Sequence, residues 1–227
     1  MKKRVLYSEL AYLIGLFILA FGTALIEKAS FGLSMVVAPA YLIHLKISEF
    51  LPFFTFGMAE YCFQGLLIIL LCFVLRKFRF SYLFSFVTAV IYGFMLDICM
   101  FAATFLSSEG MPIRICWFVS GIFLATLGIA FLFNTYLSPE AYELFVKKVS
   151  QAFGFPLFRT KFIYDLSSLF LSIALSFIFF GKLNAVGIGT VITALLNGKL
   201  IGIWSKALTE AIEFKDLLTF RNFFDKN

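Results

Sequence analysis

The sequence predicts an all-α membrane protein of six spanning helices, arranged as two inverted three-helix repeats that each carry one short re-entrant or interfacial helix. The 227-residue chain is 62% hydrophobic and 14% charged, whereas soluble domains have about 25% charged residues. Six apolar runs are long enough to cross a bilayer, which takes about 20 helical residues. Glu60 stands 33 residues before Gly93, and Asp165 stands 33 residues before Gly198. A three-span unit that occurs twice must face opposite ways, so the repeats are expected to be inverted.

A single membrane domain is expected over 1–227, with a polar turn near Gly110 and Pro112 between its two repeats. In the first repeat, residues 1–107, the spans are expected at about 10–27, 53–75 and 80–106. In the second repeat, residues 113–208, they are expected at about 115–135, 161–181 and 185–206. The tail over 209–227 mixes apolar and charged residues, and we expect it to lie as a helix on the inner interface.

Each repeat also contains an apolar segment that is too short to span. Residues 34–47 hold Pro39, and at about 14 residues they are expected to dip in from the outer side or to lie on it. Residues 138–153 begin with Ser138 as a helix cap and Pro139 at the first helical position. Because their apolar and polar side chains separate onto two faces, this helix is expected to lie at, or dip into, the inner surface.

The basic residues predict the orientation of the chain. With the N-terminus inside, fourteen Lys and Arg residues fall on inner segments, four fall on outer loops, and Lys199 lies within a span. Positive residues favour the cytoplasmic side, so both termini are expected to be cytoplasmic. The net charge of +6 is spread over the ends of the spans, which fits contact with anionic lipid and gives no nucleic-acid-binding stripe.

Ionisable side chains within the spans are the main functional candidates. Inserting each of them into the membrane costs free energy, so such residues usually have a function there. Glu60 and Asp97 are expected in the outer half of the membrane, and Gln64 lies one turn from Glu60 on the same face. We expect these three to bind a proton, a cation or a cationic group. Asp165 and Lys199 are expected near the inner side as a gating pair. Alternatively, these two reach the interface and only mark the membrane edge.

Glycines indicate where helices are expected to pack closely. Gly93 and Gly198 stand at matching places in the third and sixth spans. Gly187-Ile188-Gly189-Thr190 opens the sixth span, where two glycines permit close approach and the threonine can bond across helices. The functional alternative is a narrow waist, or a helix N-terminus that receives an anionic group. The motif lacks the preceding strand and the third glycine of a dinucleotide site.

Metal, cofactor and enzyme chemistry are not indicated. The single histidine is His44, and the four cysteines form no C-x-x-C pair, so no metal site is expected. No nucleophile–base pair is visible in the sequence. We therefore expect no cofactor and no enzymatic activity.

Three short motifs carry a resemblance to a known family. They are Gly32-Leu33-Ser34 after the first span, Gly93 followed by Asp97 in the third, and Gly187-Ile188-Gly189-Thr190 with Asn197-Gly198 in the sixth. With them the chain resembles the YczE/YitT-like bacterial integral membrane proteins over most of its length. Members usually have a proline where this chain has Met35. In the second repeat the chain has the proline, in Ser138-Pro139. The resemblance implies a multi-pass protein of the bacterial plasma membrane and no particular biochemical activity.

The expected function is that of a small secondary transporter or exporter, which moves a small solute by alternating access. One alternative is a substrate-binding subunit that needs a partner pump, and another is a structural or assembly protein. Gly121, Ala125 and Gly128 would supply a partner face on the fourth span. The expected partners are the bilayer and a small-molecule solute or ion, while a homo-oligomer and a partner membrane subunit both stay open.

Overall fold

Six long helices form the body of the computed structural model, which describes residues 4–138 and 140–217. Each of them is long and apolar enough to cross a membrane. In chain order they are α1 (Ser8–Ala29), α3 (Phe56–Leu75), α4 (Ser81–Thr104), α5 (Met111–Phe133), α7 (Leu157–Phe180) and α8 (Ile188–Ala211). The protein is therefore a multi-pass membrane protein of the all-α class, as its composition predicts.

Two short helices lie between the long ones, α2 (Ala38–Ser48) after α1 and α6 (Ala141–Phe153) after α5. Both start a few residues later than predicted. The residues before α2 form a turn. Ser138 does not cap α6, because its hydroxyl lies 2.7 Å from the hydroxyl of Ser85 on α4 instead. Pro139, the other predicted start signal, lies outside the described residues.

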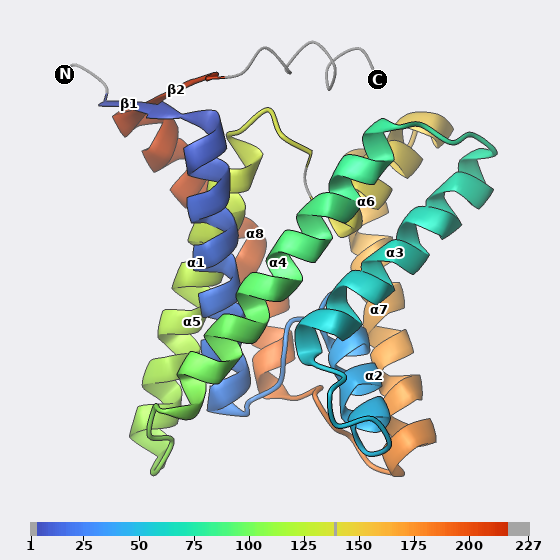
Figure 1. Ribbon diagram of the computed structural model, residues 1–227, viewed down its shortest axis with the longest axis vertical. Helices are drawn as coiled ribbons and strands as arrows, with labels where there is room; N and C mark the ends of the chain where they lie inside the picture. Colours follow the sequence, from blue (N-terminus) through green and yellow to red (C-terminus); the bar gives the residue numbers. More distant parts are fainter. Residues whose placement is uncertain (1–3, 139, 218–227) are drawn as a thin grey trace.

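The two short helices lie at opposite ends of the molecule (Figure 1). From the end that holds strand β1 (Arg4–Tyr7), α1 runs to the far end, where α2 lies, and α3 and α4 then run back and forth. α5 then runs back to the β1 end, where α6 lies, and α7 and α8 run away from that end and back to it. The six long helices therefore alternate in direction along the chain.

A two-stranded parallel ladder joins the beginning of α1 to the end of α8. β1 pairs with β2 (Ile212–Lys215), and Arg4 lies opposite Ile212. The helix predicted over 209–227 is therefore wrong for β2, where apolar and charged residues alternate with the period of a strand. Residues 218–227 of that prediction lie outside the described residues.

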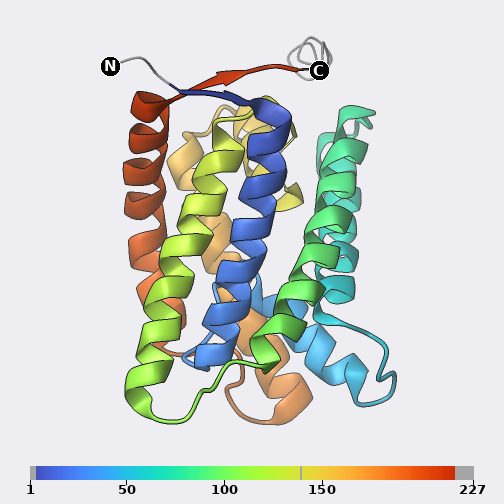
Figure 2. The ribbon, with the colours of Figure 1, turned by 60° about the vertical axis from the view of Figure 1, so that its left-hand side comes forward.

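α1 and α5 lie side by side and cross in close contact (Figure 2). A Cβ on Gly128 would lie 2.7 Å from the carbonyl oxygen of Gly15, and one on Gly121 would lie 2.8 Å from that of Gly22. Only glycine lets the two backbones approach this closely. The face predicted for a partner, which these α5 glycines share with Ala125, is thus occupied by α1 of the same chain.

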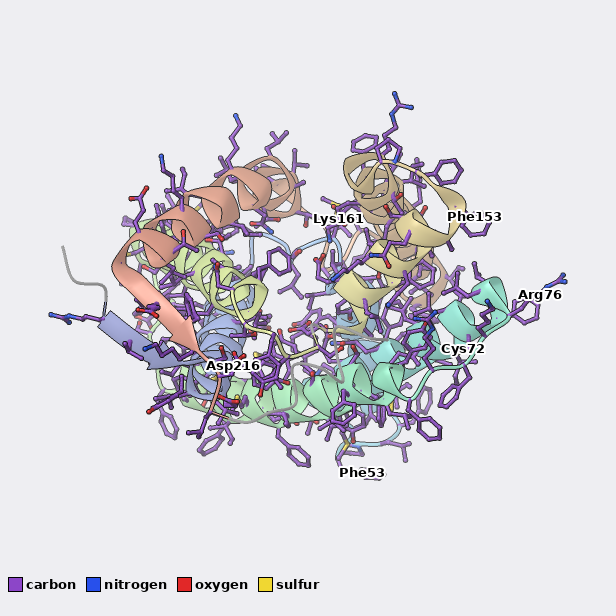
Figure 3. All side chains as sticks on the ribbon, turned by 90° about the horizontal axis from the view of Figure 1, so that it is seen from above. Phe53, Cys72, Arg76, Phe153, Lys161 and Asp216 are labelled. Atoms are coloured by element: carbon purple, nitrogen blue, oxygen red, sulfur yellow. The ribbon has the colours of Figure 1, made fainter. Side chains whose placement is uncertain are left out.

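The remaining long helices pair unequally. α3 packs against α4 along its length. By contrast, α7 and α8 are joined by residues 181–187 but do not pack along each other in the described part of the chain. They stand apart in the view of Figure 1 and in the view from the β1 end in Figure 3. The molecule is therefore open between α7 and α8.

Candidate functional site

A cavity of about 480 Å³ lies where α7 and α8 separate. Its other walls come from α1, α4, α5, α6 and the segment that precedes α2. Most of its lining is apolar and includes Leu19, Ile26, Ile129, Leu132, Leu195 and Ile201. Small-molecule sites typically have volumes of about 300–1,000 Å³. Both halves of the chain therefore enclose a volume of the right size for a small molecule.

Charged side chains gather on the α6–α7 wall of this cavity. Lys161 on α7 places its Nζ 2.9 Å from Oε1 of Glu143 on α6 and 3.2 Å from Oδ1 of Asp165. Figure 3 shows Lys161 at the opening between α8 and the α6–α7 pair. Glu140, at the beginning of α6, also lines the cavity. Among the described lining residues, three acids thus accompany one lysine.

Behind Glu140 lies a buried cluster of polar groups from α3 and α6. Gln64 donates from Nε2 to Oε2 of Glu60 and to Oε2 of Glu140, each at 3.4 Å. The hydroxyl of Tyr142 donates to the same Glu60 oxygen at 2.7 Å. The backbone N–H of Ala141 donates to Oε1 of Gln64 at 3.1 Å. Glu60 and Gln64 are fully buried, and Glu140 is 9% exposed.

Each carboxyl of this cluster keeps one oxygen that has no hydrogen-bond partner in the described structure, Oε1 of Glu60 and Oε1 of Glu140. An ionised carboxylate in such a place is costly, because burial penalises the charged form. Burial and then the nearby charge of Glu60 raise the pKa of Glu140 to about 8. Burial and the charge of Glu60 likewise raise the pKa of the Tyr142 hydroxyl. The arrangement can hold a proton or a cation on Glu140.

Glu60 and Gln64 meet as predicted, but the structure does not bring Asp97 into their cluster. The Asp97 carboxylate accepts the hydroxyl of Thr55 at 2.6 Å and the backbone N–H of Gly57 at 2.8 Å. It therefore satisfies free donors at the N-terminus of α3, where negative charge is favourable. Asp97 has a structural role in this conformation, apart from the cavity.

The predicted gating pair of Asp165 and Lys199 is also not formed. Asp165 lines the cavity as expected of a site residue, but its cation is Lys161, one helical turn earlier on α7. Lys199 is exposed on α8, and no acid of the described residues lies within ion-pair distance of it. The separation of α7 from α8 explains why the pair is absent.

The predicted close approach at the start of α8 is confirmed. A Cβ on Gly187 would lie 2.5 Å from the carbonyl oxygen of Phe31, and one on Gly189 would lie 2.8 Å from it. The Gly187 N–H donates to the hydroxyl of Thr190 at 3.1 Å. The backbone N–H groups of Gly189 and Leu33 then tie the two segments together, at 2.8 Å each. This seam lies at the end of the molecule far from β1, and its residue Leu33 lines the cavity.

The other two predicted packing glycines behave differently from each other. A Cβ on Gly93 would lie 2.7 Å from the carbonyl oxygen of Gly57, so α4 touches α3 at this point. A Cβ on Gly198 would meet nothing within 4 Å. The prediction is confirmed for Gly93 and wrong for Gly198, because α8 has no helix against this face and lines the cavity there.

Four residues of the site were not predicted as such: Glu140, Tyr142, Glu143 and Lys161. The signal for Lys161 was present, since it lies four residues before Asp165 and on the same helix face. The residues of α6 gave no comparable signal. Their sequence shows an amphipathic helix but not that its beginning reaches Glu60 inside the bundle.

The fold and the cavity define a polytopic α-helical membrane protein with a polar site inside its helix bundle. The chain matches the family described as Family of unknown function (DUF6198) over residues 6–206, and it belongs to that family. The match takes in both short helices and both walls of the cavity. No curated protein and no solved structure matches the chain.

Proposed function

We propose that this protein is a small secondary transporter or exporter that moves a small solute by alternating access. The observation that carries the proposal is the cavity between α7 and α8, which both halves of the chain enclose and which three acids line. Secondary transporters commonly bind their solute between two inverted repeats, next to broken or short helices. The arrangement of α2 and α6 at opposite ends supports this class.

Buried hydroxyl residues add support for an inverted repeat. Ser85 and Thr88 on α4 lie 105 residues before Thr190 and Thr193 on α8, the same separation as between the two acids and the two glycines that predict the repeat. All four are at most 2% exposed. In each half they lie near the first residues of a spanning helix, where they pack against the segment leading to a short helix.

The unequal pairing of the outer helices supports alternating access. Gly57 and Gly93 bring α3 and α4 into contact. Their counterparts at the repeat separation, Phe162 and Gly198, both line the cavity on α7 and α8. The helices α3 and α4 are thus in contact, while the equivalent helices α7 and α8 are apart. Exchange of these two packings would present the site to the two sides in turn, which is the usual mechanism of inverted-repeat transporters.

The proposal assigns proton or cation coupling to Glu60, Gln64 and Glu140. In the orientation that the basic residues favour, β1 and both termini are cytoplasmic and the present conformation opens inward. The far seam between the start of α8 and Phe31 then closes the outer side. The YczE/YitT-like resemblance and a location in the bacterial plasma membrane belong to the same proposal.

A solute screen tests the proposal. The purified protein in detergent would be melted in the presence of ions, metabolites and amphiphiles at several pH values, beside Glu140→Gln and the control Glu109→Gln, an exposed acid outside the cavity. A solute at 100 times its Kd should add about 2.7 kcal/mol to the folded state. Each hit would then be followed into proteoliposomes under an imposed pH gradient.

We expect at least one solute that stabilises wild type and Glu109→Gln but not Glu140→Gln, and that accumulates in the vesicles. A protein that no solute stabilises and that moves none of them would contradict transport by this chain alone. That result would favour a subunit that needs a partner pump or a structural protein.

A further inference from the structure

We propose that the cavity between α7 and α8 binds a lipophilic organic cation that enters from the bilayer. This inference rests on the proposed transport function and names the class of its substrate. Charge, lining and access each support it independently.

The charge of the cavity favours a cation. Lys161 is the one base on the described lining, and it is already paired with both Glu143 and Asp165. That triad has a net negative charge when it is ionised. Glu140 adds a further carboxyl, with a buried Oε1 that no described group satisfies. This excess of acids would repel an anionic ligand, whereas a cation would neutralise the excess negative charge.

The lining favours a ligand with a large apolar body. Apolar side chains make up most of the walls, and among the aromatic residues the rings of Tyr92, Tyr142 and Phe162 can attract a cation. A bare metal ion does not fit, because no group of three metal-ligating side chains exists among the described residues.

The route of access favours a molecule that dissolves in lipid. Phe162 on α7 and Leu195 on α8 both line the cavity, yet they are 59% and 70% exposed. They stand on α7 and α8, which do not pack together and which lie apart in Figure 3. Apolar side chains from both helices therefore border the opening. In a spanning bundle this opening faces acyl chains along α7 and α8. An amphipathic cation can partition into the bilayer and pass between the two helices.

Two ions of the same shape and opposite charge test the inference. Tritiated tetraphenylphosphonium and tetraphenylborate would each be dialysed to equilibrium against the protein in detergent, with protein-free micelles as the blank. The variants would be Glu140→Gln, which removes the unpaired acid, and Gly198→Trp, which fills the cavity from a position with nothing within 4 Å. Glu109→Gln is the matched acid control, and circular dichroism and gel filtration verify the fold of each variant.

We expect saturable binding of the phosphonium ion by wild type and Glu109→Gln. Binding should be at least tenfold weaker in Glu140→Gln and in Gly198→Trp, and tetraphenylborate should only partition into micelles. Saturable binding of the borate at equal affinity would overturn the inference. So would phosphonium binding that neither Glu140→Gln nor Gly198→Trp weakens.

The outcome separates this inference from the proposed function. If a neutral or anionic solute from the screen is transported while the phosphonium ion does not bind, transport stands and the substrate class is wrong. If the phosphonium ion binds at the cavity but does not cross proteoliposomes under any gradient beyond the leak of empty vesicles, the ligand class stands and transport is wrong.

Discussion

The side chain of Gln64 on α3 accepts the backbone N–H of Ala141, and so supplies from another helix the cap that the side chain of Glu140 does not provide. The same amide donates to Glu60 and Glu140, the two buried acids on either side of it. One fully buried side chain therefore holds the beginning of α6 against the first half of the chain. This contact fixes the position of Glu140 at the cavity.

Removing the amide of Gln64 is expected to loosen α6. Gln64→Leu keeps the size of the side chain but leaves the N–H of Ala141 and the carboxyl of Glu140 without this partner, while Glu60 keeps the hydroxyl of Tyr142. The loss should cost about 1–3 kcal/mol of unfolding free energy. The matched control is Gln151→Leu on the exposed side of the same short helix, which should change little. Thermal unfolding in detergent measures both. Equal melting temperatures for the two variants would show that Gln64 does not hold α6.

The stability of the protein is expected to fall as pH rises through neutrality. The pKa of Glu140 in the folded protein, about 8, lies above the ordinary glutamate value of 4.5, so the folded state binds this proton more tightly. Its stabilising contribution is complete below about pH 4.5 and is lost as pH rises through about 8. Glu60, Glu143 and Lys161 face the same carboxyl and contribute to the slope.

Melting curves between pH 5 and pH 9 at fixed ionic strength test this expectation. The wild-type melting temperature should decrease with pH, and Glu140→Gln should flatten the decrease because its amide does not titrate. Glu109→Gln should keep the wild-type slope. A Glu140→Gln profile that runs parallel to wild type would rule out Glu140 as the titrating group.

The two glycines at matching repeat positions should respond oppositely to alanine. Gly93→Ala places a methyl group 2.7 Å from the carbonyl oxygen of Gly57 and should destabilise the α3–α4 contact by about 1–3 kcal/mol. Gly198→Ala meets nothing within 4 Å and should stay within about 1 kcal/mol of wild type, because alanine also favours the helix. Urea or thermal unfolding of the pair provides the measurement. Similar losses at both sites would mean that α8 is packed in the resting protein as α4 is.

Alternating access predicts that Phe162 and Gly198 approach each other in a second conformation. A disulfide needs Cβ atoms about 3.5–4.5 Å apart, and in this structure a Cβ on Gly198 has no neighbour within 4 Å. Phe162→Cys with Gly198→Cys, in a chain with the four native cysteines replaced, should nevertheless cross-link under mild oxidation in proteoliposomes. Ser167→Cys with Gly198→Cys is the control, because Ser167 is exposed on α7 and does not line the cavity. Absence of the cross-link at every pH, with and without ligand, would indicate a fixed cavity.

The spans could be predicted because their signal is local. An apolar run of about 20 residues has one low-energy arrangement in a bilayer, a helix across it. The contact between Glu60 and Gln64 was predictable for the same reason, since residues four apart share a helix face. The strand after α8 had a local signal as well, in the alternation of Ile212 to Lys215.

The partners of the buried acids could not be predicted, because they depend on how deep a short helix reaches. Glu60 meets Tyr142, 82 residues away, only because the beginning of α6 lies inside the bundle. The sequence makes Asp97 a candidate ligand only because it lies deep in a span. In the structure its carboxylate instead accepts a backbone N–H at the N-terminus of the neighbouring helix α3. Gly198 matches Gly93 in pattern, but no pattern shows which of two equivalent helix pairs is open.

The pairing of β1 with β2 determines when folding can be completed during synthesis. Arg4 is made long before its partner Ile212, which follows only after α8. Contacts between residues so far apart in the sequence have a high entropic cost of loop closure. The backbone groups of β1 therefore stay unpaired while the helices insert. The ladder is therefore expected to form as the last step of folding and to fasten the first helix to the last one.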